Sequence, residues 1–167
     1  MAPLGAAGVF SAPASAAEGT SCSGDSGAAT FSPGLTGKAQ VQNIVVHGVL
    51  TVCTGTVTEA KYVAHVKTTN PVTCATLKAT GETAAGTIVV KWKPKGQGNS
   101  IGTLTLPVTE VPGASISGKV EEGPFVALGI SGTLESLTPT FTGTGEPCTK
   151  TNKLKKATLT GSPVTIS

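Results

Sequence analysis

The stretch EAKYVAHVK, residues 59–67, alternates between two kinds of side chain. Its even-numbered positions carry Ala, Tyr, Ala and Val, whereas its odd-numbered positions are mostly charged or polar. Successive side chains of an extended chain point to opposite faces, so this pattern predicts a β-strand with one buried and one solvent-facing side. His65 falls on the charged side, and we therefore expect it on the surface rather than in a buried site.

Similar short segments occur along most of the chain. Residues 87–93 and 100–108 form one predicted hairpin, and residues 115–121 and 125–134 form a second. Further strands are predicted over residues 42–57, with a candidate bulge at Gly48, near Phe141, and over residues 154–166. About nine strands, spaced by about 8–12 residues, predict an all-β protein, either an antiparallel β-sandwich or a closed β-barrel.

The composition supports a β-fold and argues against nucleic-acid binding. The chain has 167 residues, which suits one domain, and only 13% of them are charged. All 12 basic residues are lysines. Without arginine the chain lacks the planar group that recognises phosphate or guanine through two hydrogen bonds, so no nucleic-acid partner is expected.

The N-terminal segment, residues 1–16, is predicted to be a secretory signal peptide. Residues 2–10 are weakly apolar and uncharged, and Ala14 and Ala16 form an A-x-A cleavage site. The basic segment that usually precedes such a stretch is missing, so we expect the signal to be truncated. Residues 17–167 would then form a single secreted, disulfide-stapled β-domain. No later segment has the roughly 20 apolar residues of a membrane span, and none is expected.

The cysteines fit an exported protein. Cys22, Cys53, Cys74 and Cys148 form an even set, and four cysteines allow three pairings. They lack the close C-x-x-C spacing of a zinc site, so two disulfides are expected and no metal. We favour Cys22–Cys53 and Cys74–Cys148, because sequential pairing staples each half of the chain.

The segment SCSGDSG, residues 21–27, resembles the nucleophile segment of chymotrypsin-like proteases. In that family the serine follows its His and Asp in the chain, whereas Ser26 precedes both histidines, and Asp25 is the only Asp present. A turn ahead of the first strand accounts for these residues, and we predict that Ser26 is not a nucleophile.

The other candidate residues, His47, His65 and the glutamates at positions 121 and 122, do not form a recognisable catalytic or metal-binding motif. No catalytic residue, metal site or cofactor is therefore predicted.

Lysines form the candidate surface-binding site. Lys91, Lys93 and Lys95 alternate with Trp92, which shares its face with apolar residues and is expected in the core. A second basic run contains four lysines between residues 150 and 156. Either run could attract an anionic cell-wall polymer, and solvation of the surface explains both equally well.

Several longer segments resemble small exported proteins of actinobacteria. These segments are FSPGL (31–35), GVLTVCTG (48–55), VTCATL (72–77), GTIVVKW (86–92) with SIGTL (100–104), and GKVEEGPFVALGISGTL (118–134). The resemblance implies a secreted four-cysteine β-protein and assigns no site residues or activity.

Three functions stay open on the sequence alone. The first is a non-enzymatic secreted domain that binds a cell-surface polymer or an extracellular protein. The second is a small-molecule carrier, which a closed sheet around an apolar cavity would favour. The third is a hydrolase with an unrecognised site, which would require His47 and a carboxylate to meet in a cleft.

Overall fold

The computed structural model describes residues 18–141 and 143–167. These residues form nine β-strands and a short 3-10 helix, η2 (Cys74–Lys78). The strands are β2 (Thr20–Leu35), β3 (Asn43–Cys53), β4 (Glu59–Thr68), β5 (Thr83–Lys93), β6 (Asn99–Pro107), β7 (Ala114–Glu122), β8 (Gly129–Thr140), β9 (Leu154–Gly161) and β10 (Val164–Ile166). The predicted signal peptide, residues 1–16, lies outside the described residues. Across the part of the chain that is described, no helix is long and apolar enough to cross a membrane.

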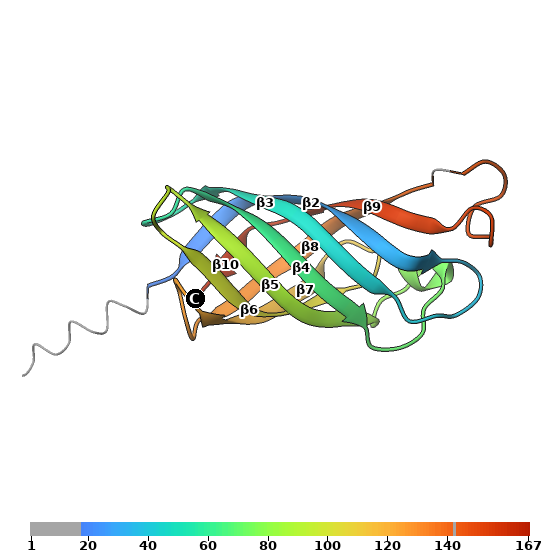
Figure 1. Ribbon diagram of the computed structural model, residues 1–167, viewed down its shortest axis with the longest axis horizontal. Helices are drawn as coiled ribbons and strands as arrows, with labels where there is room; N and C mark the ends of the chain where they lie inside the picture. The colour runs from blue at the N-terminus through green and yellow to red at the C-terminus, as the bar shows by residue number, and fades with distance from the viewer. Residues whose placement is uncertain (1–17, 142) are drawn as a thin grey trace, which may run out of the picture.

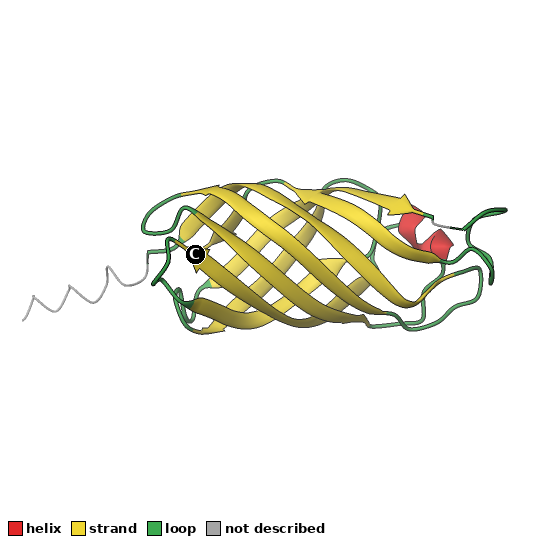
Figure 2. Cartoon of the chain, turned by 45° about the horizontal axis from the view of Figure 1, so that its top comes forward, coloured by secondary structure: helices red, strands yellow, loops and turns green. Residues whose placement is uncertain are grey.

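The strands form a closed antiparallel barrel (Figures 1 and 2). From β2 to β9 each strand pairs with the next, and β9 returns to pair with β2. The short β10 continues β9 along β2 in the same register. Gly161 of β9 lies opposite Asp25 of β2, and Val164 of β10 lies opposite Cys22 of β2. Pro163, which lacks an N–H group, lies in the break between the two strands. The all-β prediction is confirmed, and of its two forms the barrel is the one observed.

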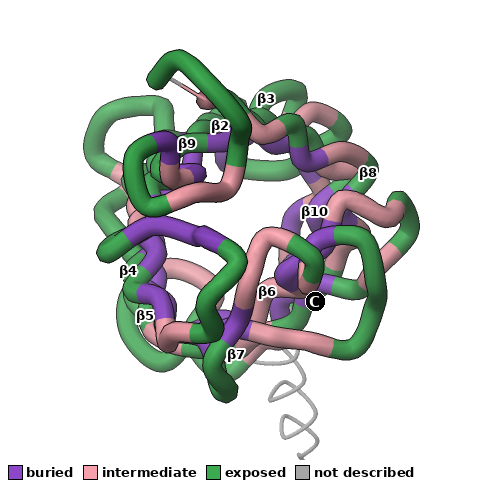
Figure 3. The backbone as a smooth tube through the Cα atoms, turned by 90° about the vertical axis from the view of Figure 1, so that its right-hand side faces the viewer, coloured by how far each residue is buried: buried purple, intermediate pink, exposed green. Residues whose placement is uncertain are grey.

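The core fills the barrel from inside, as the alternating pattern requires. In β4 the four even-numbered positions 60–66 are buried, whereas His65 is exposed, as predicted. Trp92 is also buried as expected, with its indole Nε1 donating to Ser100 Oγ at 2.8 Å and its ring edge-on to Phe125. Viewed along the barrel, buried segments lie in the wall and exposed segments dominate the connecting loops (Figure 3).

Two disulfides staple opposite ends of the barrel, and they confirm the sequential pairing. Cys22 and Cys53 are register partners on β2 and β3 at the end where both described termini lie. Cys74, at the start of η2, is bonded to Cys148 in the long connection between β8 and β9. The second bond therefore fastens two loops that no strand pairing holds together.

Several sequence-based expectations were wrong in detail. Ser26 is not in a turn but within β2, a 16-residue strand that was not predicted. Its Gly and Ser residues have low strand propensity, and ladders on both sides, to β3 and β9, override that preference. No bulge occurs at Gly48, where pairing with both neighbours runs without a register shift. The strand expected near Phe141 is not a separate one, because β8 runs without interruption from Gly129 to Thr140.

We expect both disulfides to stabilise the fold strongly. They close loops with sequence separations of 31 and 74 residues, for which the chain-entropy estimate is about 4 kcal/mol each. Replacing Cys74 and Cys148 by Ala should therefore lower the melting temperature by roughly 10 °C, measured by circular dichroism. Replacing Cys22 and Cys53 should have a slightly smaller effect, because that loop is shorter. Free thiols in the unreduced, denatured wild-type protein would contradict this account.

Candidate functional site

The barrel encloses an apolar cavity of about 70 Å³. All nine strands contribute inward-facing side chains to its wall, and nearly all of these are Leu, Ile, Val, Ala or Phe. An eight-stranded barrel is just wide enough for side chains to fill it or for one small ligand to be held. The space remains here because small residues, among them Ala29, Ala60 and Ala64, occupy many inward positions.

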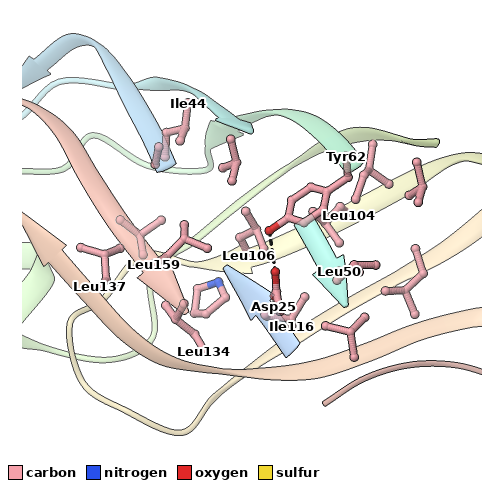
Figure 4. Close-up of a pocket in the computed structure, with 18 of the residues that line it drawn as sticks. Asp25, Ile44, Leu50, Tyr62, Leu104, Leu106, Ile116, Leu134, Leu137 and Leu159 are labelled. Carbon is pink, nitrogen blue, oxygen red and sulfur yellow. Dashed lines mark hydrogen bonds between the residues drawn. The ribbon is translucent and has the colours of Figure 1, made fainter. Parts of the chain in front are cut away.

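Asp25 and Tyr62 are the polar exceptions in the cavity wall (Figure 4). Asp25 points inward from β2, and Tyr62 points inward from β4, with β3 between them. The Tyr62 hydroxyl donates a hydrogen bond to Asp25 Oδ1 at 2.8 Å. The Tyr62 side chain therefore crosses the inner face of β3 to reach its partner.

Glycine makes this crossing possible. Gly48 is the register partner of Tyr62 on β3, and Gly27 is the register partner of Gly48 on β2. A Cβ atom on Gly48 would lie 2.3 Å from Cζ of the Tyr62 ring, far inside van der Waals contact. The ring thus packs directly against the bare backbone of β3. The glycine that suggested a bulge in the sequence instead provides room for an aromatic side chain.

Burial governs the ionisation of both polar groups. Desolvation raises the pKa of Asp25 above its ordinary value, and the hydrogen bond from Tyr62 offsets part of this rise. Desolvation also raises the pKa of Tyr62, helped by the nearby charge of Asp25 and by the hydrogen bond between them. Tyr62 therefore stays protonated and remains a donor at any physiological pH. The cavity combines an apolar wall with one acceptor group whose charge depends on pH.

The residues considered for catalysis lie elsewhere. Ser26 neighbours Asp25 in β2, so its side chain faces the outside of the barrel. His47 and His65 also face outward, on β3 and β4, away from the cavity. Within residues 18–141 and 143–167, no group of three His, Cys, Asp or Glu residues could hold a metal ion. The structure does not bring a nucleophile, base and acid together around Ser26.

The three candidate surface lysines occupy different environments. Lys91 is exposed on the outer face of β5, directly opposite Lys61 of β4. Lys93 Nζ lies 3.2 Å from Glu59 Oε1, so its charge is paired. Lys95 is exposed in the turn between β5 and β6. Lys91 and Lys93 share the outer face of β5, two residues apart, and Lys95 lies just beyond the end of this strand. Lys61, the register partner of Lys91, was missed in the sequence.

Asp25 and Tyr62 were missed as a pair. The signal was present, because positions 25, 27, 29 and 31 share one phase and lead into buried Ala29 and Phe31. This alternation has meaning only if residues 20–35 form a strand. Interpreting residues 21–27 as a turn therefore concealed that Asp25 faces the same side as Ala29 and Phe31.

Comparisons with protein-family models, with curated proteins and with solved structures gave no match. The class of the protein is therefore defined by its own geometry. It is a closed, disulfide-bonded β-barrel with an apolar cavity whose wall contains the hydrogen-bonded pair Asp25 and Tyr62.

The raised pKa of Asp25 should make stability depend on pH. An acid whose pKa is higher in the folded than in the unfolded state destabilises the fold once it ionises. The free energy of unfolding should therefore fall as pH rises from the ordinary value of 3.8 through the raised pKa. Asp25→Asn cannot ionise and should abolish this fall, leaving the variant more stable than wild type at pH 7. Urea titrations between pH 3 and 8 test this, and parallel curves for the two proteins would contradict it.

We also expect that any side chain at position 48 would collide with the Tyr62 ring, which occupies the space next to Gly48 inside the barrel. Gly48→Ala should displace the ring, break the hydrogen bond to Asp25 and destabilise the fold by about 1–3 kcal/mol. Gly37→Ala is a matched control, because nothing lies within 4 Å of a Cβ at that exposed loop position. Urea denaturation of both variants measures the difference. Equal effects of the two substitutions would refute the proposed packing.

Proposed function

We propose that this protein is a secreted, non-enzymatic carrier that holds a small, mainly apolar molecule inside its barrel. The observation that carries the proposal is the apolar cavity of about 70 Å³, bounded by all nine strands and containing one polar pair. An apolar cavity with a few placed polar groups is the usual form of a small-molecule site. Closure of the sheet supports a carrier over the other sequence-based alternatives.

The cavity limits the ligand in size and character. One water molecule needs a cavity of about 10–15 Å³, so the cavity has room for about five to seven water-sized spheres. A short aliphatic chain or a small ring fits these limits, whereas a drug-sized molecule needs several times more. Asp25 and the Tyr62 hydroxyl would orient one polar group of the ligand, and the remaining wall would bury its apolar part.

The proposed extracellular location rests on the covalent structure and on the N-terminal segment. Two disulfides, with no free cysteine among the described residues, suit an oxidising compartment. The A-x-A site and the resemblance to exported actinobacterial proteins point the same way. N-terminal sequencing of the protein from culture medium would locate the mature start.

A hydrolase is less well supported by the cavity. Its wall offers one carboxyl and one phenol, and it includes no His, Ser or Cys. General acid–base or nucleophilic chemistry at neutral pH relies mainly on those missing groups or on a second carboxylate. The apolar wall instead favours binding through exclusion of water.

The proposal predicts that filling the cavity abolishes ligand binding. Val46 faces the cavity between Ala29 and Ala64, its small register partners, so Val46→Phe should occupy the empty space. Val45→Phe, one residue earlier on the same strand, adds the same ring to the outer face and serves as the control. Straight-chain alcohols from butanol to octanol are suitable probes.

We expect one or more of these alcohols to raise the melting temperature of wild type and of Val45→Phe, since a ligand at about 100 times its Kd adds about 2.7 kcal/mol. Val46→Phe should show no such rise. Methyl chemical shifts of the cavity-lining residues in NMR spectra would locate the bound alcohol. No stabilisation of wild type by any probe, or equal stabilisation of Val46→Phe, would refute the carrier function.

A further inference from the structure

The outer surface of the barrel divides into two walls of opposite charge. One wall consists of β9, β2, β3, β4 and β5, which are consecutive neighbours in the closed sheet. Their exposed charged residues, histidines aside, are six lysines and one glutamate: Lys61, Lys67, Lys91, Lys93, Lys155, Lys156 and Glu59. The other wall consists of β6, β7 and β8, and carries one exposed lysine and three exposed glutamates: Lys119, Glu121, Glu122 and Glu135. This division could not be seen in a net charge of only +3.

The lysine-rich wall, defined as the outer face of β9, β2, β3, β4 and β5, is also hollowed. A depression of about 760 Å³ lies across these five strands, outside the barrel. Its floor includes the small, outward-facing Ser26 and Ala28 and the backbone of the inward-facing Gly27 and Gly48. The longer side chains of Lys61 and Lys91 line it as well. A chain molecule laid across the wall would therefore contact both the small residues and the lysines.

Two lysines of this wall face each other without a balancing acid. Lys61 and Lys91 are register partners on β4 and β5, and like charges directly opposite each other destabilise a sheet. In the described part of the chain the ion pairs are Lys78–Glu110 and Lys93–Glu59, neither of which involves this pair. The other acid of these five strands, Asp25, is turned into the barrel. A bound anion would remove the repulsion between the two ammonium groups.

We propose that the lysine-rich wall binds an anionic polysaccharide, a hydroxylated chain with negative groups at intervals. Ammonium groups supply the charge complementarity as point charges. The exposed hydroxyls of Ser26, Thr158 and Thr160 line the same depression and can exchange hydrogen bonds with sugar hydroxyls. The aromatic residues of these five strands, Phe31, Tyr62 and Trp92, are all buried, so the wall has no platform on which nucleic-acid bases could stack.

This surface is separate from the cavity of the proposed carrier. Ser26 faces the depression, whereas its neighbour Asp25 faces the cavity, so the two sites lie on opposite faces of one sheet. The proposal also changes the candidate surface residues. Lys91 remains a candidate binding residue, and Lys61 becomes one, because both line the depression. Lys93 and Lys95 do not line it.

Binding of three polymers to the mature protein tests the proposal. Polygalacturonate carries both carboxylates and hydroxyls, polyglutamate carries carboxylates alone, and dextran carries hydroxyls alone. We expect polygalacturonate to bind most tightly, with an affinity that falls as salt is added, polyglutamate to bind more weakly, and dextran not to bind. The double variant Lys61→Glu/Lys91→Glu should weaken binding of polygalacturonate by about tenfold or more.

Lysines outside the lysine-rich wall supply the control. Lys38→Glu/Lys119→Glu changes the net charge equally but replaces exposed residues outside both the lysine-rich wall and the depression, and Lys119→Glu alone changes one of them. Both control variants should leave polygalacturonate affinity within about twofold. All these side chains are exposed, and unchanged melting temperatures would verify folding. Equal losses in Lys119→Glu and Lys61→Glu/Lys91→Glu, or unchanged binding in the latter, would overturn the assigned site.

Two further outcomes would overturn the ligand class. Equal binding of dextran and polygalacturonate would show that charge is irrelevant. Equal binding of polyglutamate and polygalacturonate would indicate an acidic protein partner rather than a polysaccharide. The alcohol-induced rise in melting temperature, measured in the same variants, reports on the cavity separately, so failure of this proposal is distinguishable from failure of the carrier function.

Discussion

The pairing of β2 with β9 is the constraint on which the rest of the structure depends. It joins the first described strand to the last long one and turns an open meander into a closed barrel. Closure removes both exposed sheet edges and fixes which face of every strand is inside. It also creates an enclosed interior, so that residues contributed by all nine strands can bound one apolar cavity.

Closure gives neighbouring residues of one strand opposite environments. Asp25 enters a medium where ionisation is costly and where the Tyr62 hydroxyl is its hydrogen-bond partner. Ser26, one residue later, faces water on the lysine-rich wall. The single-residue alternation that defines a strand thus separates a binding cavity from a charged outer surface, across the thickness of one sheet. The two proposed ligands differ in chemistry for the same reason.

The parts predicted well from the sequence are those in which local pattern and tertiary environment agree. Residues 59–67 and 87–93 alternate clearly, so their strands and the burial of Trp92 could be predicted. β2 could not be predicted, because its sequence is typical of a turn and its extended form is imposed by two neighbouring ladders. The inward position of Asp25 could not be predicted for the same reason. The lysine-rich wall depends on barrel closure, which brings Lys156 of β9 round to the strands carrying Lys61, and no local pattern contains that information.

Gly48 links the two faces of the barrel. Inside, its missing side chain lets the Tyr62 ring pack against β3 and reach Asp25. Outside, the same stretch of backbone, together with Gly27, forms the floor of the depression between the lysines. Tyr62 lines both the cavity and the depression, and its ring packs from inside on the backbone of β3, whose outer side forms part of the floor. One glycine position in β3 therefore shapes both the packing inside the barrel and the surface outside it.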